Sequence, residues 1–250
     1  MDKNVINIIL TNKCNGDCKY CYLKNKYEVT DINNIHIDKN KIIELTSGIS
    51  ESFTNVDKLY QIVEIIRKND NVLKELYLYT NGIIDNKNVE NFLIENRDLV
   101  RLKISLDGPK EENDKYRIDV YGNGMYDRTI EFIRKYKKYV FSINGVIAPK
   151  HNIKKCMWFL YDLCLKNDFT LLIVPMLPVK KWNKKKLLYY YNCLDKIELI
   201  NLNQEKSIRL IRICGDITRY KEVDKYGIIQ KIDDYTWEEA FFDNNNWIMI

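Results

Sequence analysis

Proline, glycine and histidine are scarce in this chain of 250 residues, which has 4 prolines, 9 glycines and 2 histidines. So few prolines and glycines exclude low-complexity linkers. No apolar run reaches the length that crosses a membrane. The first residues lack the basic segment ahead of a long apolar core that marks a signal peptide. We therefore expect a soluble globular protein, and its 46% hydrophobic and 30% charged residues are ordinary for that class.

The chain also lacks the even set of cysteines that a secreted disulfide framework needs. It has seven, and three of them are clustered. We therefore expect a reduced, oxygen-poor cytoplasm. The net charge of +5 is mild and its lysines are spread along the chain, so it neither requires nor excludes a nucleic-acid partner.

The clustered cysteines are Cys14, Cys18 and Cys21, with the spacing C-x3-C-x2-C. A cubane iron–sulfur cluster normally takes four thiolates, so a loop that offers three leaves one iron open for a substrate. Zinc is the alternative. It needs a fourth Cys or His at finger-like spacing, and His36, the histidine nearby, belongs to no ligand pair. The spacing therefore favours an open [4Fe-4S] cluster.

This run has Asn15 after the first cysteine and Tyr20 and Tyr22 around the third. It resembles the cluster motif of the radical S-adenosylmethionine (SAM) superfamily. The resemblance implies that the open iron binds the amino and carboxylate groups of SAM, with Tyr20 among the cofactor contacts. One electron then splits SAM into methionine and a 5′-deoxyadenosyl radical, which abstracts hydrogen from a substrate. A reductant such as flavodoxin or ferredoxin is implied as a partner.

Apolar strands alternate with helices along the chain, which indicates βα units and a parallel sheet. Strands are predicted at 5–10, near Gly48, and at 76–79, 100–106, 139–147 and 170–177; helices are predicted at 55–66, 89–93, 126–136 and 152–165. This count agrees with the α/β fold of the resembled family, a partial (β/α)6 TIM-like barrel whose ligands bind at the carboxyl ends of the strands. We expect the barrel at residues 1–179 and a small α+β extension at residues 180–250.

The family's Gly-Gly-Glu-Pro motif, which meets the SAM amino group after the second strand, is missing here. Its nearest counterpart is Ser47-Gly48-Ile49-Ser50-Glu51, where Gly48 permits close backbone approach and Glu51 faces the ammonium. The alternatives are that residues 42–45 form the family's first helix and that Glu51 is a solvated loop carboxylate.

The other SAM contacts that the resemblance implies lie at later strand ends: Thr80, Asn81, Ser105, Arg117, Asn144, Val146 and Met176. Arg117 offers a planar fork of donors that suits a carboxylate. It is otherwise a surface arginine paired with Asp114 or Asp119. Core packing is the alternative for the apolar positions. Asp107 either caps a loop or positions a substrate.

The last third resembles the auxiliary-cluster domain of the peptide-modifying branch in a degenerate form. Cys214-Gly215 and a turn at residues 224–227 keep its outline, but the second cysteine is missing. One thiolate cannot hold a cubane, so we read residues 207–233 as a relic β-hairpin without a second cluster. Cys156, Cys164 and Cys193 are expected to be buried as small hydrophobes.

Two classes of function follow. The first is a radical SAM enzyme that acts on a ribosomally made peptide by cross-linking or epimerisation, and epimerisation would need a thiol hydrogen donor such as Cys214. A small metabolite or a tRNA nucleoside is the alternative substrate. The second class is a non-catalytic iron–sulfur or zinc-binding module, although an electron carrier needs no six-unit barrel.

Overall fold

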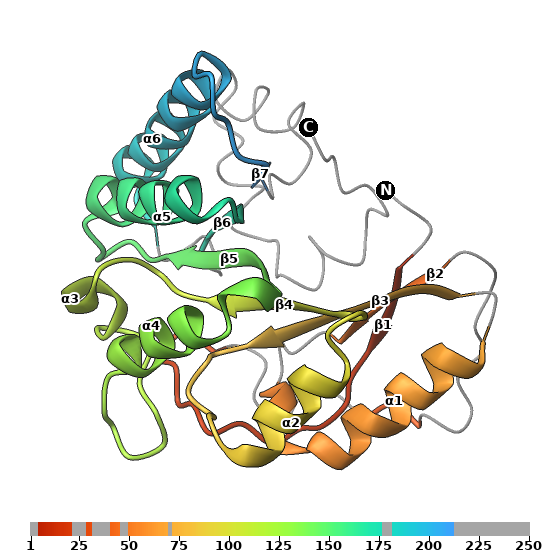
Figure 1. Cartoon of the computed structure of the whole chain (residues 1–250). Coiled ribbons are helices and arrows are strands. Elements are labelled where there is room, and N and C mark those ends of the chain that lie inside the picture. Colours follow the sequence, from red (N-terminus) through yellow and green to blue (C-terminus); the bar gives the residue numbers. More distant parts are fainter. Residues whose placement is uncertain are drawn as a thin grey trace. The chain divides into compact units, whose positions relative to one another are not determined.

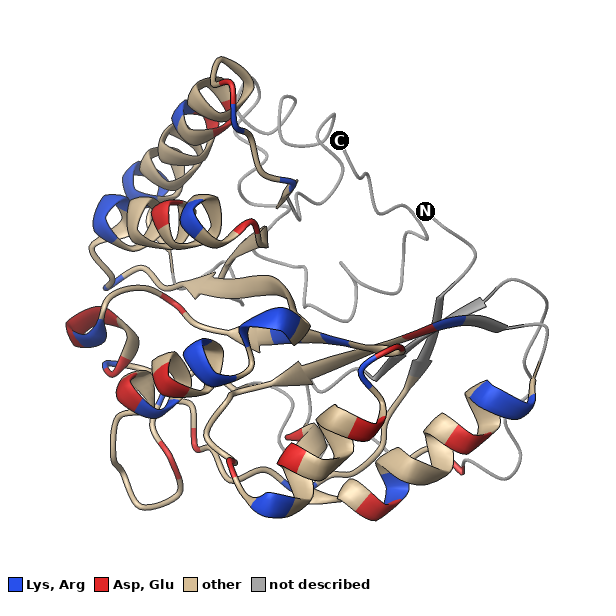
Figure 2. Ribbon diagram, viewed as in Figure 1, with Lys and Arg blue, Asp and Glu red and all other residues tan. Residues whose placement is uncertain are grey.

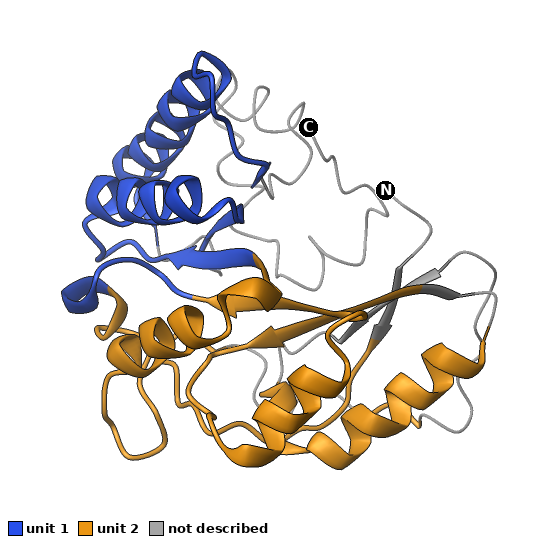
Figure 3. Cartoon of the chain, in the orientation of Figure 1, with its two compact units in different colours: residues 1, 106–112, 142–250 blue, residues 2–105, 113–141 orange. Residues whose placement is uncertain are grey.

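The computed structural model describes residues 5–21, 29–31, 41–45, 50–69, 72–176 and 182–212. The chain divides into two compact units, coloured separately in Figure 3. Unit 2 holds residues 2–105 and 113–141, and unit 1 holds residues 106–112 and 142–250 together with Met1. The last crossing between the units, after Phe141, falls inside one strand, β5 (Val140–Ile147).

Unit 2 contains a parallel sheet with the strand order β1-β2-β3-β4. The strands are β1 (Val5–Ile8), β2 (Lys41–Leu45), β3 (Val72–Thr80) and β4 (Val100–Ser105). Its helices are α1 (Val56–Lys68), α2 (Lys87–Glu95) and α4 (Tyr126–Lys135), with the short turns η2 (Ser52–Thr54) and η3 (Lys137–Tyr139). The one-turn helix α3 (Lys110–Asn113) begins in unit 1.

Burial alternates along the two long strands of unit 2. The fully buried side chains are Leu76, Leu78, Leu102 and Ile104, and the half-buried ones between them are Tyr77, Tyr79, Arg101 and Lys103. Helix α1 packs against β3 and also against α2 (Figure 1). Because successive side chains of a strand point to opposite faces, one face of this sheet is apolar and the other carries rings and charges. Figure 2 shows charges of both signs along α1 and α2.

In unit 1 the strands pair in parallel in the order β5-β6-β7. The unit adds β6 (Thr170–Pro175) and β7 (Leu210–Arg212) to β5, and its helices α5 (Ile153–Asn167) and α6 (Lys184–Leu202) pack against each other. Across both units, four helices begin after an asparagine whose side chain accepts a hydrogen bond from the first turn: Asn55, Asn86, Asn152 and Asn183. Such caps satisfy backbone donors that the helix itself leaves unpaired.

Most of the predicted elements are confirmed, including the Asn55 cap. The second strand lies at residues 41–45, so its prediction near Gly48 was too late and the alternative helix at residues 42–45 is wrong. The β-branched pair Ile42-Ile43 explains the strand. Gly48 and the hairpin residues 213–233 lie outside the described residues. No bounds were predicted for α6, and the short elements α3 and β7 were not predicted.

The thiols of Cys156, Cys164 and Cys193 are buried, as expected. No helix in the described part of the chain is both long enough and apolar enough to span a membrane.

Candidate active site

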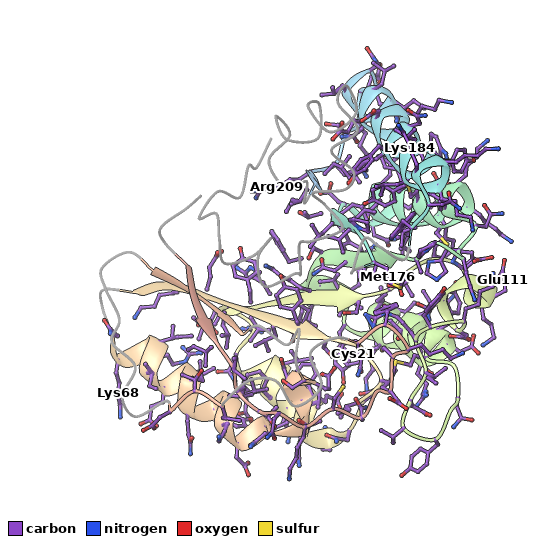
Figure 4. All side chains as sticks on the ribbon, turned by 180° about the vertical axis from the view of Figure 1, so that it is seen from behind. Cys21, Lys68, Glu111, Met176, Lys184 and Arg209 are labelled. Carbon is purple, nitrogen blue, oxygen red and sulfur yellow. The ribbon has the colours of Figure 1, made fainter. Side chains whose placement is uncertain are left out.

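The cysteine loop, residues 11–21, follows β1 and is shaped by short-range hydrogen bonds. The hydroxyl of Thr11 accepts from the Lys13 amide at 3.1 Å, and the Gly16 amide donates to Cys14 Sγ at 3.3 Å. The Cys21 amide donates to the Cys18 carbonyl at 3.0 Å. Cys14 is exposed, Cys18 and Cys21 are half-buried, and none of the three forms a disulfide; Figure 4 labels Cys21. The loop therefore carries three thiol groups that are available to bind a metal.

Backbone pairing locks this loop to residues about a hundred positions later. Asp17 donates to the Ile118 carbonyl at 2.8 Å, Lys19 donates to the Tyr116 carbonyl at 2.9 Å, and Val120 donates to the Asn15 carbonyl at 3.1 Å. The rings of Tyr20 and Tyr116 stack with centroids 5.8 Å apart. The positions of the cysteines therefore depend on the segment 116–120.

Arg117 lies in that segment and is only 8% exposed. Its Nη1 lies 3.8 Å from Cys18 Sγ, and its guanidinium lies over the Tyr20 ring, 5.8 Å from the centroid. The alternative of a surface arginine is wrong because the residue is buried; Asp119, one of the partners considered, forms an ion pair with Arg128 at 2.7 Å. A buried cation beside a thiol favours the thiolate, which is the form of cysteine that ligates metals.

Glu51 precedes η2 and is 1% exposed, so the alternative of a solvated carboxylate is wrong. Its Oε1 accepts from Thr80 Oγ1 at 2.7 Å and from the Phe53 amide at 3.2 Å. Its Oε2 accepts from the Asn81 amide at 2.7 Å. Burial raises the pKa of Glu51 to about 7, against the lowering effect of these donors and of the Arg117 charge. Glu51 therefore fixes the end of β3.

Asn81 connects the end of β3 to the cysteine loop. Its Nδ2 donates to Asn15 Oδ1 at 2.8 Å, and its carbonyl accepts from Thr129 Oγ1 at 2.8 Å. Glu51 makes a second connection, because its amide donates to the Lys13 carbonyl at 3.0 Å. Sequence reasoning singled out Asn15 and Asn81 but missed that they bind each other; the pairing of two amide side chains leaves no pattern in a single sequence.

The predicted contacts in unit 1 lie on β5 and β6. Asn144 Oδ1 accepts from the Ser142 hydroxyl at 2.8 Å, while its buried Nδ2 has no hydrogen-bond partner among the described residues. Such an amide fits a ligand acceptor such as a ribose hydroxyl. The Val146 amide donates to Asp107 Oδ1 at 3.0 Å, which favours the loop-capping interpretation of Asp107.

Met176 follows β6, where the backbone edge for adenine is predicted. Its amide donates to the Ile147 carbonyl at 2.7 Å, and its carbonyl accepts from Trp182 Nε1 at 2.8 Å. A carbonyl oxygen has a second lone pair, so these bonds leave room for one more donor. Ser105 ends β4 and is half-buried.

The chemistry of the three cysteines suits a cubane. Partial burial raises the pKa of the Cys14 thiol above its usual range although the residue keeps an exposed edge, so iron binding must displace the proton. Within the described residues, no three Cys, His, Asp or Glu side chains are placed to share one metal ion. A cubane does not need that arrangement, because each cysteine binds a different iron.

Comparisons with known proteins point to one superfamily. Residues 8–160 match the Radical SAM superfamily. The cysteine-type anaerobic sulfatase-maturating enzyme of Clostridium perfringens is 22% identical over 259 residues, which cover 93% of this chain and 59% of that enzyme. A GTP 3′,8-cyclase of the same species is 30% identical over 253 residues, which cover 94% of this chain and 75% of the cyclase. The chain therefore spans less than two thirds of the maturating enzyme.

The fold has solved counterparts. The Streptococcus suis protein SuiB, bound to the precursor peptide SuiA, matches with a TM-score of 0.62 and 14% identity, covering 95% of this chain and 54% of SuiB. That likeness concerns the fold, and it confirms the partial TIM-like barrel. The superfamily uses a [4Fe-4S] cluster and SAM. Since the match at residues 8–160 covers more than half of the chain and includes all three clustered cysteines, this protein belongs to the radical SAM superfamily.

Proposed function

We propose that this chain is a radical SAM enzyme whose cluster ligands are Cys14, Cys18 and Cys21. When bound, the cluster supplies the electron that splits SAM into methionine and a 5′-deoxyadenosyl radical, which takes a hydrogen atom from the substrate. One observation carries the proposal: three thiols outside any disulfide lie on a single loop that backbone hydrogen bonds hold to residues 116–120.

The chain's own residues bind and orient SAM in this proposal. Arg117, buried beside Cys18, gives SAM's carboxylate a bidentate donor close to the cluster. The Nδ2 of Asn144, which has no hydrogen-bond partner in the described part of the chain, donates to the ribose. Glu51, Thr80 and Asn81 hold the end of β3 against the cysteine loop, and Glu51 offers negative charge to the SAM ammonium. The further proposed cofactor contacts are Tyr20, Gly48, Ser105, Val146 and Met176.

Three further parts of the proposal rest on the sequence. Residues 1–179 form the barrel domain and residues 180–250 form an extension without a second cluster. The electron comes from a reductant of the flavodoxin or ferredoxin type. The free thiols suit the reducing cytoplasm.

The test of cofactor chemistry is anaerobic reconstitution followed by incubation with SAM and dithionite. We expect about four irons for each chain and the release of 5′-deoxyadenosine. We also expect an electron paramagnetic resonance spectrum that shifts when SAM is added. Cys18→Ala should abolish release and lower the iron content, whereas the matched control Cys193→Ala, a buried thiol on α6, should keep both. An iron-free wild-type protein, or equal loss in both variants, would contradict the assignment.

For the substrate we favour a ribosomally made polypeptide. The support is the cysteine-loop sequence, the relic hairpin outline at Cys214-Gly215 and the similarity to an enzyme named for maturing a sulfatase. The similarity to a GTP cyclase favours a second candidate, GTP. On the half-buried face of β3 and β4, Lys103 Nζ lies 3.4 Å from Tyr79 Oη and 4.8 Å from the ring centroid. An ammonium held there suits an anionic group of either substrate.

Substrate-stimulated SAM cleavage separates the two candidates. The rate of 5′-deoxyadenosine release is measured with dithionite alone, with GTP, and with precursor peptides encoded beside the gene. We expect a peptide to stimulate release and to change in mass by the loss of two hydrogens in a cross-link, or to gain deuterium from solvent without other change in an epimer. Stimulation by GTP alone would overturn the peptide assignment and leave the SAM chemistry intact.

A further inference from the structure

We propose that residues 118–124, here called the hairpin tip, form the docking site for the protein that delivers the electron, and that this partner is a small acidic one-electron carrier. The inference rests on the proposed function, because only a chain with a reducible cluster needs such a partner. The backbone of residues 118 and 120 holds the cysteine loop, whereas the side chains of Val120 and Tyr121 have no part in the SAM or substrate assignments.

The hairpin tip is rigid because one buried carboxylate organises it. Asp119, 4% exposed, accepts at Oδ1 from the amides of Tyr121 and Asn123, both at 2.9 Å, and pairs at Oδ2 with Arg128. The Gly122 amide donates to the Asp119 carbonyl at 3.0 Å, and the positive φ of Gly122 (83°) permits this turn. A surface that is already ordered loses little entropy when a partner binds.

Two apolar side chains stand out from this rigid turn. Tyr121 is 87% exposed and Val120 is 54% exposed. Tyrosine is one of the residues that most often dominate binding at protein interfaces. Interfaces between redox proteins are small and weak, so one exposed aromatic side chain with charged residues around it is enough for such a contact.

The hairpin tip adjoins the cysteine loop directly. The Val120 amide donates to the Asn15 carbonyl at 3.1 Å, and Gly16 forms an isolated antiparallel bridge with Asp119. Cys14 lies between Lys13 and Asn15 and is exposed. A carrier seated on Tyr121 is therefore beside the ligands of the cluster, where a short electron-transfer distance is available.

Exposed lysines around this surface select the charge of the partner. Lys13 and Lys19 lie on the cysteine loop, and Lys115 precedes Tyr116, whose carbonyl binds the Lys19 amide. Asp119, the acid nearest in sequence to Tyr121, is buried and its charge is paired with Arg128. Complementary charge speeds the encounter of redox proteins and fixes their orientation, which points to an acidic carrier.

Replacing Tyr121 by an acidic or by a basic residue tests the docking site, because the two variants carry charges of opposite sign. The initial rate of 5′-deoxyadenosine release is measured against the concentration of a reduced acidic flavodoxin, and separately with dithionite. We expect Tyr121→Asp to raise the KM for flavodoxin about tenfold, and Tyr121→Lys to raise it about threefold or less because the new charge attracts the carrier. Both variants should keep the wild-type rate with dithionite, which needs no docking. The control Ile94→Asp changes an exposed residue of α2 and should alter neither rate.

An unchanged KM for flavodoxin in Tyr121→Asp, or equal effects of Asp and Lys, would overturn the docking site. Absence of activity with dithionite in the wild type would instead overturn the proposed function. A direct binding measurement keeps the two apart: titration calorimetry of oxidised flavodoxin should show weaker binding for Tyr121→Asp than for the wild type, and equal affinities would again refute the site.

Discussion

Glu51 is a carboxyl group whose protonation is coupled to folding. In the folded chain the pKa is raised from 4.5 to about 7 by burial. The folded state therefore holds this proton more tightly than the unfolded state between these two pH values. Stability contributed by the protonated form is present at low pH and is lost as pH rises toward about 7.

We expect Glu51→Gln to remove this dependence. Between pH 5 and pH 8 the free energy of unfolding of the wild-type protein should fall by on the order of 2 to 3 kcal/mol more than that of the variant, from 1.36 kcal/mol for each pKa unit. Urea unfolding of the metal-free proteins at several pH values measures it. The lost hydrogen bond should change the free energy of unfolding of the variant by the same amount at every pH. Only the slopes of that free energy against pH are therefore compared. Parallel slopes would show that Glu51 does not titrate with folding.

Arg117 gives a prediction about geometry rather than charge. Arg117→Lys keeps the positive charge but loses the fork that binds a carboxylate at two points. We expect the KM for SAM to rise by about 10- to 100-fold, since hydrogen bonds to charged groups contribute about 1.5–3 kcal/mol, with iron content unchanged. Arg134→Lys, an exposed position on α4, is the matched control. A variant that loses iron instead of SAM affinity would assign Arg117 to holding the cysteine loop.

At the scale of elements, Gly108 shows how tightly residues 106–112 pack against α5 within unit 1. A Cβ at this position would lie 2.7 Å from Cys156 Sγ and 3.2 Å from its Cα, and φ is 155°. We expect Gly108→Ala to lower the free energy of unfolding by about 2 to 5 kcal/mol, combining backbone strain with overpacking. Gly122→Ala also has a positive φ but meets nothing within 4 Å, so about 1 to 2 kcal/mol is expected. Chemical denaturation measures the free energy of unfolding of both variants, and the difference between them gives the contribution of packing at Gly108. Equal losses of stability in the two variants would contradict such a contribution.

The elements that sequence could predict are those with a periodic apolar pattern. Runs such as Leu76–Tyr79 and the capped helix after Asn55 carry that pattern within a few residues, and they are confirmed. The second strand was misplaced because a missing motif, rather than the Ile42-Ile43 pair, was used to locate it.

Among the site residues, the cysteine cluster can be recognised from the sequence because three thiols lie within eight positions. The pairing of residues 15–19 with 116–120 cannot, because it is made by backbone groups that every sequence possesses. The burial of Arg117 depends on the same pairing, which is why a surface position had been an open alternative.

At the scale of the whole molecule, the apolar cores of both units are made without the cysteine loop. Fully buried residues such as Leu59, Leu78, Leu160 and Ile173 lie on helices and strands. We therefore expect removal of iron by a chelator to leave the far-ultraviolet circular dichroism spectrum unchanged, unlike a zinc finger, which unfolds. Hydrogen exchange should become faster at residues 15–19 and stay slow in β3. Collapse of the spectrum would show that iron is part of the folding core.

The antiparallel contact between residues 15–19 and 116–120 also sets an order of events during synthesis. The thiols leave the ribosome first, while Arg117 follows Cys18 by 99 positions. At about 5–20 residues per second the nascent chain carries an unsupported thiol triad for about 5 to 20 seconds. Iron delivered in that interval would meet a cysteine loop that still lacks its partner segment. We therefore expect cluster insertion to follow the synthesis of residues 116–120.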